Sequence, residues 1–281
     1  MREGDQRQAL ACPHCGAPKE ERRPQAMTTV KRLVCLANSR KLSGRCIAGI
    51  EVDRGHQRPG RPGGQRLGWI RPVSAREHEE VSEYERQYKD GSDPRVLDVI
   101  DVPLLDPVPK SYQQENWLLD PERYWQKVTL EERGREPVVW GDLERFADPA
   151  APLWIDGHHT RPGRNDKIPL ELASDVTTSL RLVRIDRLTL VVFKPGKTFG
   201  NSKRRVQGRF VHHGTQYRLW VTDPGYERAY LAKPDGDYQI GESFLTVSLG
   251  EPYKDACYKL IAAIITPEAP EEAAPDDGPS A

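Results

Sequence analysis

The sequence predicts a mainly β protein with short helices, in which two small β-barrels are joined by an aromatic-rich, partly helical insert. Three observations lead to this class. A chain of 281 residues is long enough for two domains of ordinary size. Short apolar runs alternate with Gly- and Pro-containing turns in two separate parts of the chain, which is typical of small closed sheets. Between these parts the sequence is rich in Trp and Tyr and has no strand periodicity.

The first β-rich domain is expected at residues 30–108. Its strand candidates are apolar or alternating runs bounded by turn residues, at 31–36, 45–52, 67–73 and 96–105. The charged stretch 77–89 predicts a short helix between the last two strands. Pro103 confines the final strand to an edge or exit position, because proline cannot donate a ladder hydrogen bond.

The connecting insert is expected at residues 109–174. An Asp-Pro-Glu start at Asp120 supplies an N-cap residue followed by proline and predicts a helix over 120–128. A second short helix is expected at 140–146. Because tryptophans at this density must pack on something, the insert should dock across both domains.

The second β-rich domain is expected at residues 175–265. Its strand candidates lie at 179–193, 205–221, 228–231, 242–248 and 257–265, separated by Gly/Pro turns. The apolar positions of the first of these strands change phase midway. A β-bulge near Asp186 would keep the apolar face turned inward.

The two ends of the chain lack the composition of a folded domain. Residues 1–29 are expected to form a disordered or extended segment, and Met27 is a candidate natural start. Residues 266–281 form an acidic tail without Lys or Arg, which predicts disorder. Because Lys plus Arg and Asp plus Glu are equal at 42 each, removing this tail leaves a slightly basic folded part.

Composition also limits the cellular setting. No apolar run approaches the roughly 20 residues needed to cross a bilayer, so the sequence predicts a cytoplasmic protein that does not enter membranes. Five cysteines are an odd number, which favours free thiols over a disulfide framework. The sequence indicates no cofactor, no metal site and no catalytic residue.

A cationic turn in the first domain is the first candidate site. Arg40, Lys41 and Arg45 surround the polar turn after the first strand, where guanidinium groups and backbone N–H groups could bind a phosphate. Further along, Trp69 and Arg71 are two residues apart and should share one face of a strand. A solvated turn, and a buried Trp beside a surface Arg, are the plain alternatives.

The chain resembles the dual OB-containing family through residues 31–50, 68–74, 97–105 and 112–125. The resemblance covers about 30–265. It implies two OB-like barrels and, by analogy of fold, binding of nucleic acid or a nucleotide within prokaryotic conflict or antiviral defence systems.

A basic loop in the second domain is the second candidate site. Its proposed contacts with nucleic acid are Lys197, Phe199, Lys203, Arg204 and Arg205. The hairpin that follows adds Arg209, Arg218 and Trp220. Cationic grooves with aromatic platforms are how OB barrels bind single strands, whereas a solubilising hairpin loop is the alternative.

Two other functions stay open at this point. Asp156, His158, His159 and Asp166 could serve a metal-dependent nuclease or nucleotide hydrolase, although an ordered loop between the barrels explains them more simply. An adaptor would instead bind a protein partner through the Trp-rich insert. The sequence favours a non-enzymatic binding protein whose partner is nucleic acid or a nucleotide.

Overall fold

The computed structural model describes residues 27–52, 68–129, 137–149 and 152–268. Most of the expected N-terminal segment 1–29 and of the acidic tail 266–281 lies outside these ranges. Strands dominate the described residues and the helices are short. The predicted mainly β class is therefore confirmed.

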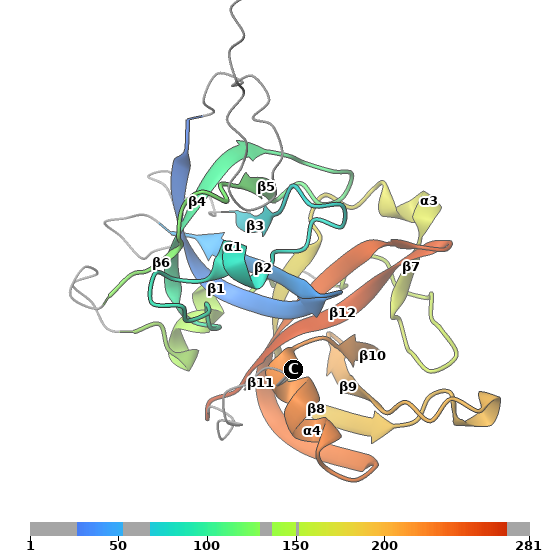
Figure 1. The fold of residues 1–281 in the computed structure, drawn as a ribbon. Coiled ribbons are helices and arrows are strands. Elements are labelled where there is room, and N and C mark those ends of the chain that lie inside the picture. The colour runs from blue at the N-terminus through green and yellow to red at the C-terminus, as the bar shows by residue number, and fades with distance from the viewer. Residues whose placement is uncertain (1–26, 53–67, 130–136, 150–151, 269–281) are drawn as a thin grey trace, which may run out of the picture.

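Five strands close into the first barrel (Figure 1). They are β1 (Thr29–Lys41), β2 (Gly44–Glu51), β3 (Trp69–Val73), β4 (Val99–Pro107) and β5 (Asn116–Leu119). They pair in the order β1-β2-β3-β5-β4, and β4 also pairs with β1. β3 and β5 are parallel, whereas the other neighbours are antiparallel. Helix α1 (Glu83–Arg86) lies between β3 and β4.

The second barrel repeats this connectivity. Its strands are β8 (Leu180–Phe193), β9 (Arg205–His212), β10 (Thr215–Val221), β11 (Gly236–Tyr253) and β12 (Ala256–Ile265). They pair in the order β10-β9-β8-β11-β12, and β12 closes the ring by pairing parallel with β10. Helix α4 (Pro224–Leu231) again lies between the third and fourth strands. The shared Greek-key connectivity confirms the expectation of two OB-like barrels.

The predicted bulge in the first strand of this barrel is present. Ile185 pairs with Ser243 and Leu188 pairs with Gly241, so two residues of β8 oppose one residue of β11. Asp186 and Arg187 are the two bulged residues, and both are exposed. The bulge keeps Ile185 and Leu188 in the barrel core despite the change of phase between them.

The two barrels share an apolar junction. Alternate residues of β1 serve different cores: Leu33 and Cys35 point into the first barrel, whereas Val34 and Leu36 belong to a cluster that includes residues of the second. From the second barrel, the junction receives Leu180, Leu182, Phe244, Ala262, Ala263 and Ile265. In Figure 1, β12 runs along the boundary between the barrels.

The segment expected to connect the barrels does more than connect them. It supplies the fifth strand of the first barrel, β5, and the edge strands β6 (Gln126–Lys127) and β7 (Lys167–Pro169). It also holds α3 (Leu170–Ala173) and the 3-10 helix η1 (Trp140–Arg145), which was expected. Trp140 packs edge-on against Phe244 with ring centroids 4.7 Å apart, so this segment contacts the junction directly.

Two local expectations were wrong. Residues 120–128 form a turn followed by β6 instead of a helix, because Trp125 is fully buried in the first core and Lys127 pairs with Ile100. The expected strand 228–231 is the end of α4, which Asp223 caps by accepting hydrogen bonds from the backbone N–H groups of Gly225 and Tyr226. No helix in the described ranges combines the length and apolar character needed to span a bilayer.

Candidate nucleic-acid interface

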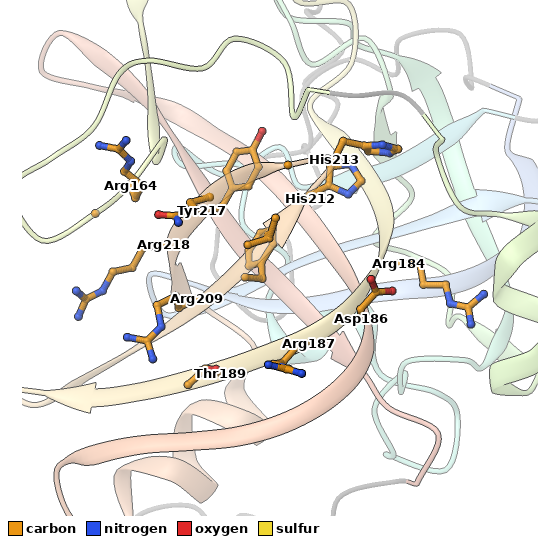
Figure 2. Close-up of a pocket in the computed structure, with 15 residues that line it drawn as sticks. Arg164, Arg184, Asp186, Arg187, Thr189, Arg209, His212, His213, Tyr217 and Arg218 are labelled. Atoms are coloured by element: carbon orange, nitrogen blue, oxygen red, sulfur yellow. The ribbon is translucent and has the colours of Figure 1, made fainter.

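Five arginines line a groove of about 1160 Å³ on the outside of the second barrel (Figure 2). They come from β8, β9, β10 and the segment before β7, and are Arg164, Arg184, Arg187, Arg209 and Arg218. Asp186 is the only carboxylate residue lining the same groove within the described part of the chain. We call this feature the arginine groove.

Strand alternation places the central pair of arginines. Phe210 and Leu219 pack inside the barrel, so their neighbours Arg209 and Arg218 face outward. The two arginines are directly opposite each other in the antiparallel register, and Figure 2 shows them projecting side by side. Like charges in this position oppose each other. A bound anion would remove that repulsion.

Two further arginines are brought to the groove by irregular backbone. Arg187 occupies the β8 bulge, which turns it outward. Arg164 forms an isolated bridge with Arg218, in which the backbone N–H of each residue donates to the carbonyl of the other at 3.2 and 3.0 Å. The bridge fixes a residue far away in sequence beside β10.

The arginines of the groove differ in their ion pairs. Arg184 binds Glu242 and Glu144, and Arg209 binds Asp237 at 2.6 Å. Arg164, Arg187 and Arg218, in contrast, have no ion pair with any described residue. Burial lowers the pKa of Arg218, and the nearby charge of Arg209 lowers it further. The Nε atom of Arg218 is also buried without a hydrogen-bond partner among the described residues.

A stacked aromatic pair contacts one arginine of the groove. Phe193 of β8 and Trp220 of β10 lie with ring centroids 5.9 Å apart and planes inclined by only 7°. Each ring also contacts an arginine: Arg218 lies 5.0 Å from the centre of Phe193, and Arg205 lies 4.1 Å from the centre of Trp220. Burial lowers the pKa of Arg205. Aromatic faces next to guanidinium groups are the ingredients of a base-stacking platform.

A second cleft, of about 770 Å³, lies where the barrels meet. Arg40 and Lys41 of the first barrel line this junction cleft together with Arg205 and Trp220 of the second. The aromatic pair therefore stands between the two cavities, because Trp220 lines the junction cleft and the arginine on Phe193 lines the groove.

The family of the chain follows from its sequence together with this architecture. The profile of the dual OB-containing domain matches residues 31–264, which span both barrels. The chain belongs to the dual OB-containing domain family. No curated protein and no solved structure matches it.

The structure of this dual OB-containing domain brings four of the predicted site residues together. The junction cleft is lined by Arg40, Lys41, Arg71 and Arg205, although they come from distant parts of the sequence. Arg40 forms an ion pair with Glu227 of α4 at 3.0 Å, and Lys41 forms one with Glu251 of β11 at 2.7 Å. These carboxylates neutralise the two cations and also tie the barrels together.

Three predicted residues of the first barrel have contacts within the molecule. Arg71 is buried, and its guanidinium lies 3.1 Å from the Glu115 carboxylate and donates to Ser179 of the second barrel. Trp69 is half-buried and packs against both apolar clusters of the junction. Arg45 pairs through its backbone with Val81. Interior packing therefore engages Trp69 and Arg71 in this dual OB-containing domain.

We expect Arg71→Ala to lower the free energy of unfolding by about 3 kcal/mol, because it leaves the buried Glu115 carboxylate without its counter-charge. Replacing both partners, as in Arg71→Met with Glu115→Leu, should recover most of that loss. Urea denaturation of the three proteins measures the effect. A stability of Arg71→Ala equal to the unsubstituted protein would contradict this structural role.

The predicted basic loop connects the first two strands of the second barrel, and only some of its predicted side chains are free to meet a ligand. Lys197, Phe199 and Lys203 are exposed, with Phe199 76% exposed in the 3-10 helix η2 (Lys197–Phe199). Arg204 instead turns back to bind Asp235 at 2.6 Å and to donate to the carbonyls of Leu231 and Lys233. Arg204 thereby holds the end of α4.

Sequence reasoning missed Arg164, Arg187 and Phe193. Phe193 ends an apolar run and looked like a core residue, and Arg164 lies in the expected insert. The bulge near Asp186 was the one signal that could have indicated Arg187, because a bulge turns two consecutive side chains outward. Arg209, Arg218 and Trp220 had been noted only as neighbours of the loop.

The two carboxylates of the His/Asp cluster considered for metal-dependent catalysis are engaged in structural contacts. Asp156 accepts hydrogen bonds from the hydroxyl of Tyr217 at 2.7 Å and from the ammonium group of Lys259 at 2.9 Å. Burial lowers the pKa of Lys259, and Asp156 opposes that shift. Asp166 accepts from the backbone N–H and the hydroxyl of Thr160. In the described ranges, no group of three or more His, Cys, Asp or Glu side chains is placed to hold a metal ion.

The tryptophans of the expected insert also pack within the molecule. Trp125 is fully buried and Trp154 nearly so, while Trp140 packs on Phe244 at the junction. Trp117 is half-buried below the ammonium group of Lys31, 4.5 Å from its ring centre. These contacts use the rings that a protein-binding surface would need to expose.

Proposed function

We propose that this protein binds single-stranded nucleic acid along the outer face of its second barrel, without catalysis. The observation that carries the proposal is the set of three arginines without ion pairs, Arg164, Arg187 and Arg218, of which Arg218 contacts the stacked pair formed by Phe193 and Trp220. Arginines suit phosphates, and aromatic faces suit unpaired bases. A role as the recognition component of a prokaryotic conflict system belongs to this proposal.

The position of the site within the fold supports the proposal. OB barrels bind oligonucleotides on their second and third strands and on the loop between the first and second. In the second barrel these are β9, β10 and residues 194–204, which hold Arg209, Arg218, Trp220 and the exposed Lys197 and Lys203. The arginine groove therefore coincides with the expected ligand face of an OB barrel.

The first barrel has its equivalent face covered. Ala48 and Ile50 of β2 and Trp69 of β3 pack against the apolar clusters that join the barrels. A strand of nucleic acid cannot reach that face without separating the two barrels. The first barrel contributes instead at the junction cleft, where the ion pairs of Arg40 and Lys41 with the second barrel hold the two barrels together beside Trp220.

Fluorescence anisotropy tests the proposal with labelled oligonucleotides of about 16 nucleotides, the upper site size for one OB barrel. We expect single strands to bind more tightly than duplexes of the same sequence, because only unpaired bases can stack. We expect log K to fall with log salt with a slope of about −2 or steeper, since each single-strand phosphate contributes about −0.7. Failure to bind any single strand at low salt would refute the proposal.

A further inference from the structure

A buried glutamine lies on the strand between the two stacked rings. Gln207 of β9 pairs in register with Val191 of β8 and with Trp220 of β10. Its neighbours Val206 and Gly208 face the core, where an added Cβ at Gly208 would meet Ile261 at 2.3 Å. Gln207 therefore points to the outer face of the barrel.

The side chain of Gln207 is enclosed but has no polar partner. The residue is fully buried, and both its Oε1 and Nε2 atoms lack a hydrogen-bond partner among the described residues. Phe193 and Trp220 project from the strands on either side of it, and their rings approach to 5.9 Å across β9. A buried amide with neither bond satisfied destabilises a fold, so its presence needs an explanation.

The spacing of the strands offers an explanation for the unsatisfied amide of Gln207. β8 and β10 are separated by two strand intervals, about 9.6 Å. A base held between two parallel rings needs about 7 Å between them, which is two contact distances of about 3.5 Å. The rings are already parallel within 7°. The rings, whose centroids are 5.9 Å apart, would have to move apart to admit a base, and the edge of that base would then face Gln207 on the central strand.

We infer that Phe193 and Trp220 open to sandwich one adenine of a bound strand, and that the Gln207 amide reads the edge of that base. The inference rests on the proposed function and specifies its base selectivity. The amide offers an acceptor and a donor side by side, which match the N6 amino group and N7 of adenine. Adenine presents such a pair on its Watson–Crick edge as well, through N6 and N1, whereas cytosine and thymine present one on the Watson–Crick edge alone. Adenine therefore satisfies Gln207 with either edge, which favours it over the two pyrimidines.

The test compares oligo(dA), oligo(dC) and oligo(dT) of equal length on the unsubstituted protein and on Gln207→Met, a near-isosteric apolar variant. We expect the unsubstituted protein to bind oligo(dA) roughly tenfold more tightly than the other two. Gln207→Met should lose this preference while keeping the same salt slope. Gln207→Leu provides a second apolar variant for the same comparison.

A stability measurement distinguishes recognition from a packing role. Because the unliganded protein buries the amide unsatisfied, Gln207→Met should raise its melting temperature by roughly 2–4 °C. Equal binding of all three oligonucleotides, or a preference for adenine that survives in both variants, would overturn the inference and leave the proposed function intact. A lower melting temperature in both variants would overturn it as well, by showing that the amide stabilises the fold. Absence of binding to every oligonucleotide would refute the proposed function and the inference together.

Discussion

Replacing Arg164, Arg187 and Arg218 together by glutamine is expected to weaken binding of single-stranded nucleic acid by ten- to a hundredfold at physiological salt. These are the arginines of the groove without an ion pair, so their charge is available to phosphates. The magnitude of the salt slope should fall by about 2, roughly 0.7 for each lost phosphate contact. Anisotropy titrations at several salt concentrations measure both quantities.

Arg184→Gln is the matched control. Arg184 lines the same groove, but Glu242 and Glu144 bind its guanidinium, and Figure 2 shows it directed to the opposite side from Arg209 and Arg218. Its substitution should change affinity by less than about threefold, in keeping with a charge that is already neutralised. Should the triple variant keep both the affinity and the salt slope of the unsubstituted protein, the groove is not the binding site.

Phe244→Ala is expected to lower the free energy of unfolding by about 3–5 kcal/mol, the usual cost of removing a buried phenyl ring. Phe244 is 2% exposed and packs at the junction against Trp140. Because the surrounding cluster contains residues of both barrels, we expect one unfolding transition for the whole molecule. Urea denaturation monitored by both circular dichroism and tryptophan fluorescence measures the loss of unfolding free energy and the number of transitions.

Phe199→Ala is the control for this second experiment. Phe199 is 76% exposed on the basic loop, and its loss should change stability by no more than about 0.5 kcal/mol. Two separate transitions, one for each barrel, would contradict a shared core. So would a change in Phe244→Ala as small as that in Phe199→Ala.

The junction links stability to the proposed site. Arg40 and Arg205 enter the same cleft only because the barrels are held against each other. Leu36 and Ala48 supply the outward apolar surface of the first barrel, and the second barrel covers it. The first barrel thus acts as a support that packs against the second, while the groove belongs to the second.

The sequence by itself determined the fold class, the approximate place of most strands and the bulge near Asp186. These features depend on alternation of apolar residues and on turn chemistry, which act between near neighbours in the chain. The same local information placed basic and aromatic residues around 197–220, where Arg218 and Trp220 of the proposed site lie, but it missed Arg164, Arg187 and Phe193. It also predicted a helix at 120–128, which sheet pairing of Lys127 and burial of Trp125 override.

Only the tertiary structure decided which charges remain available for a ligand. Arg71 and Arg187 both lie in predicted strands, and the sequence does not distinguish their roles. In the folded chain, Arg71 is buried against Glu115 and Ser179. Arg187, in contrast, faces the groove without an ion pair to a described residue. Ion pairs form between residues that the fold brings together from distant positions, as Arg40 and Glu227 show. Local sequence patterns carry no information about such partners, so the availability of each arginine is a property of the folded chain.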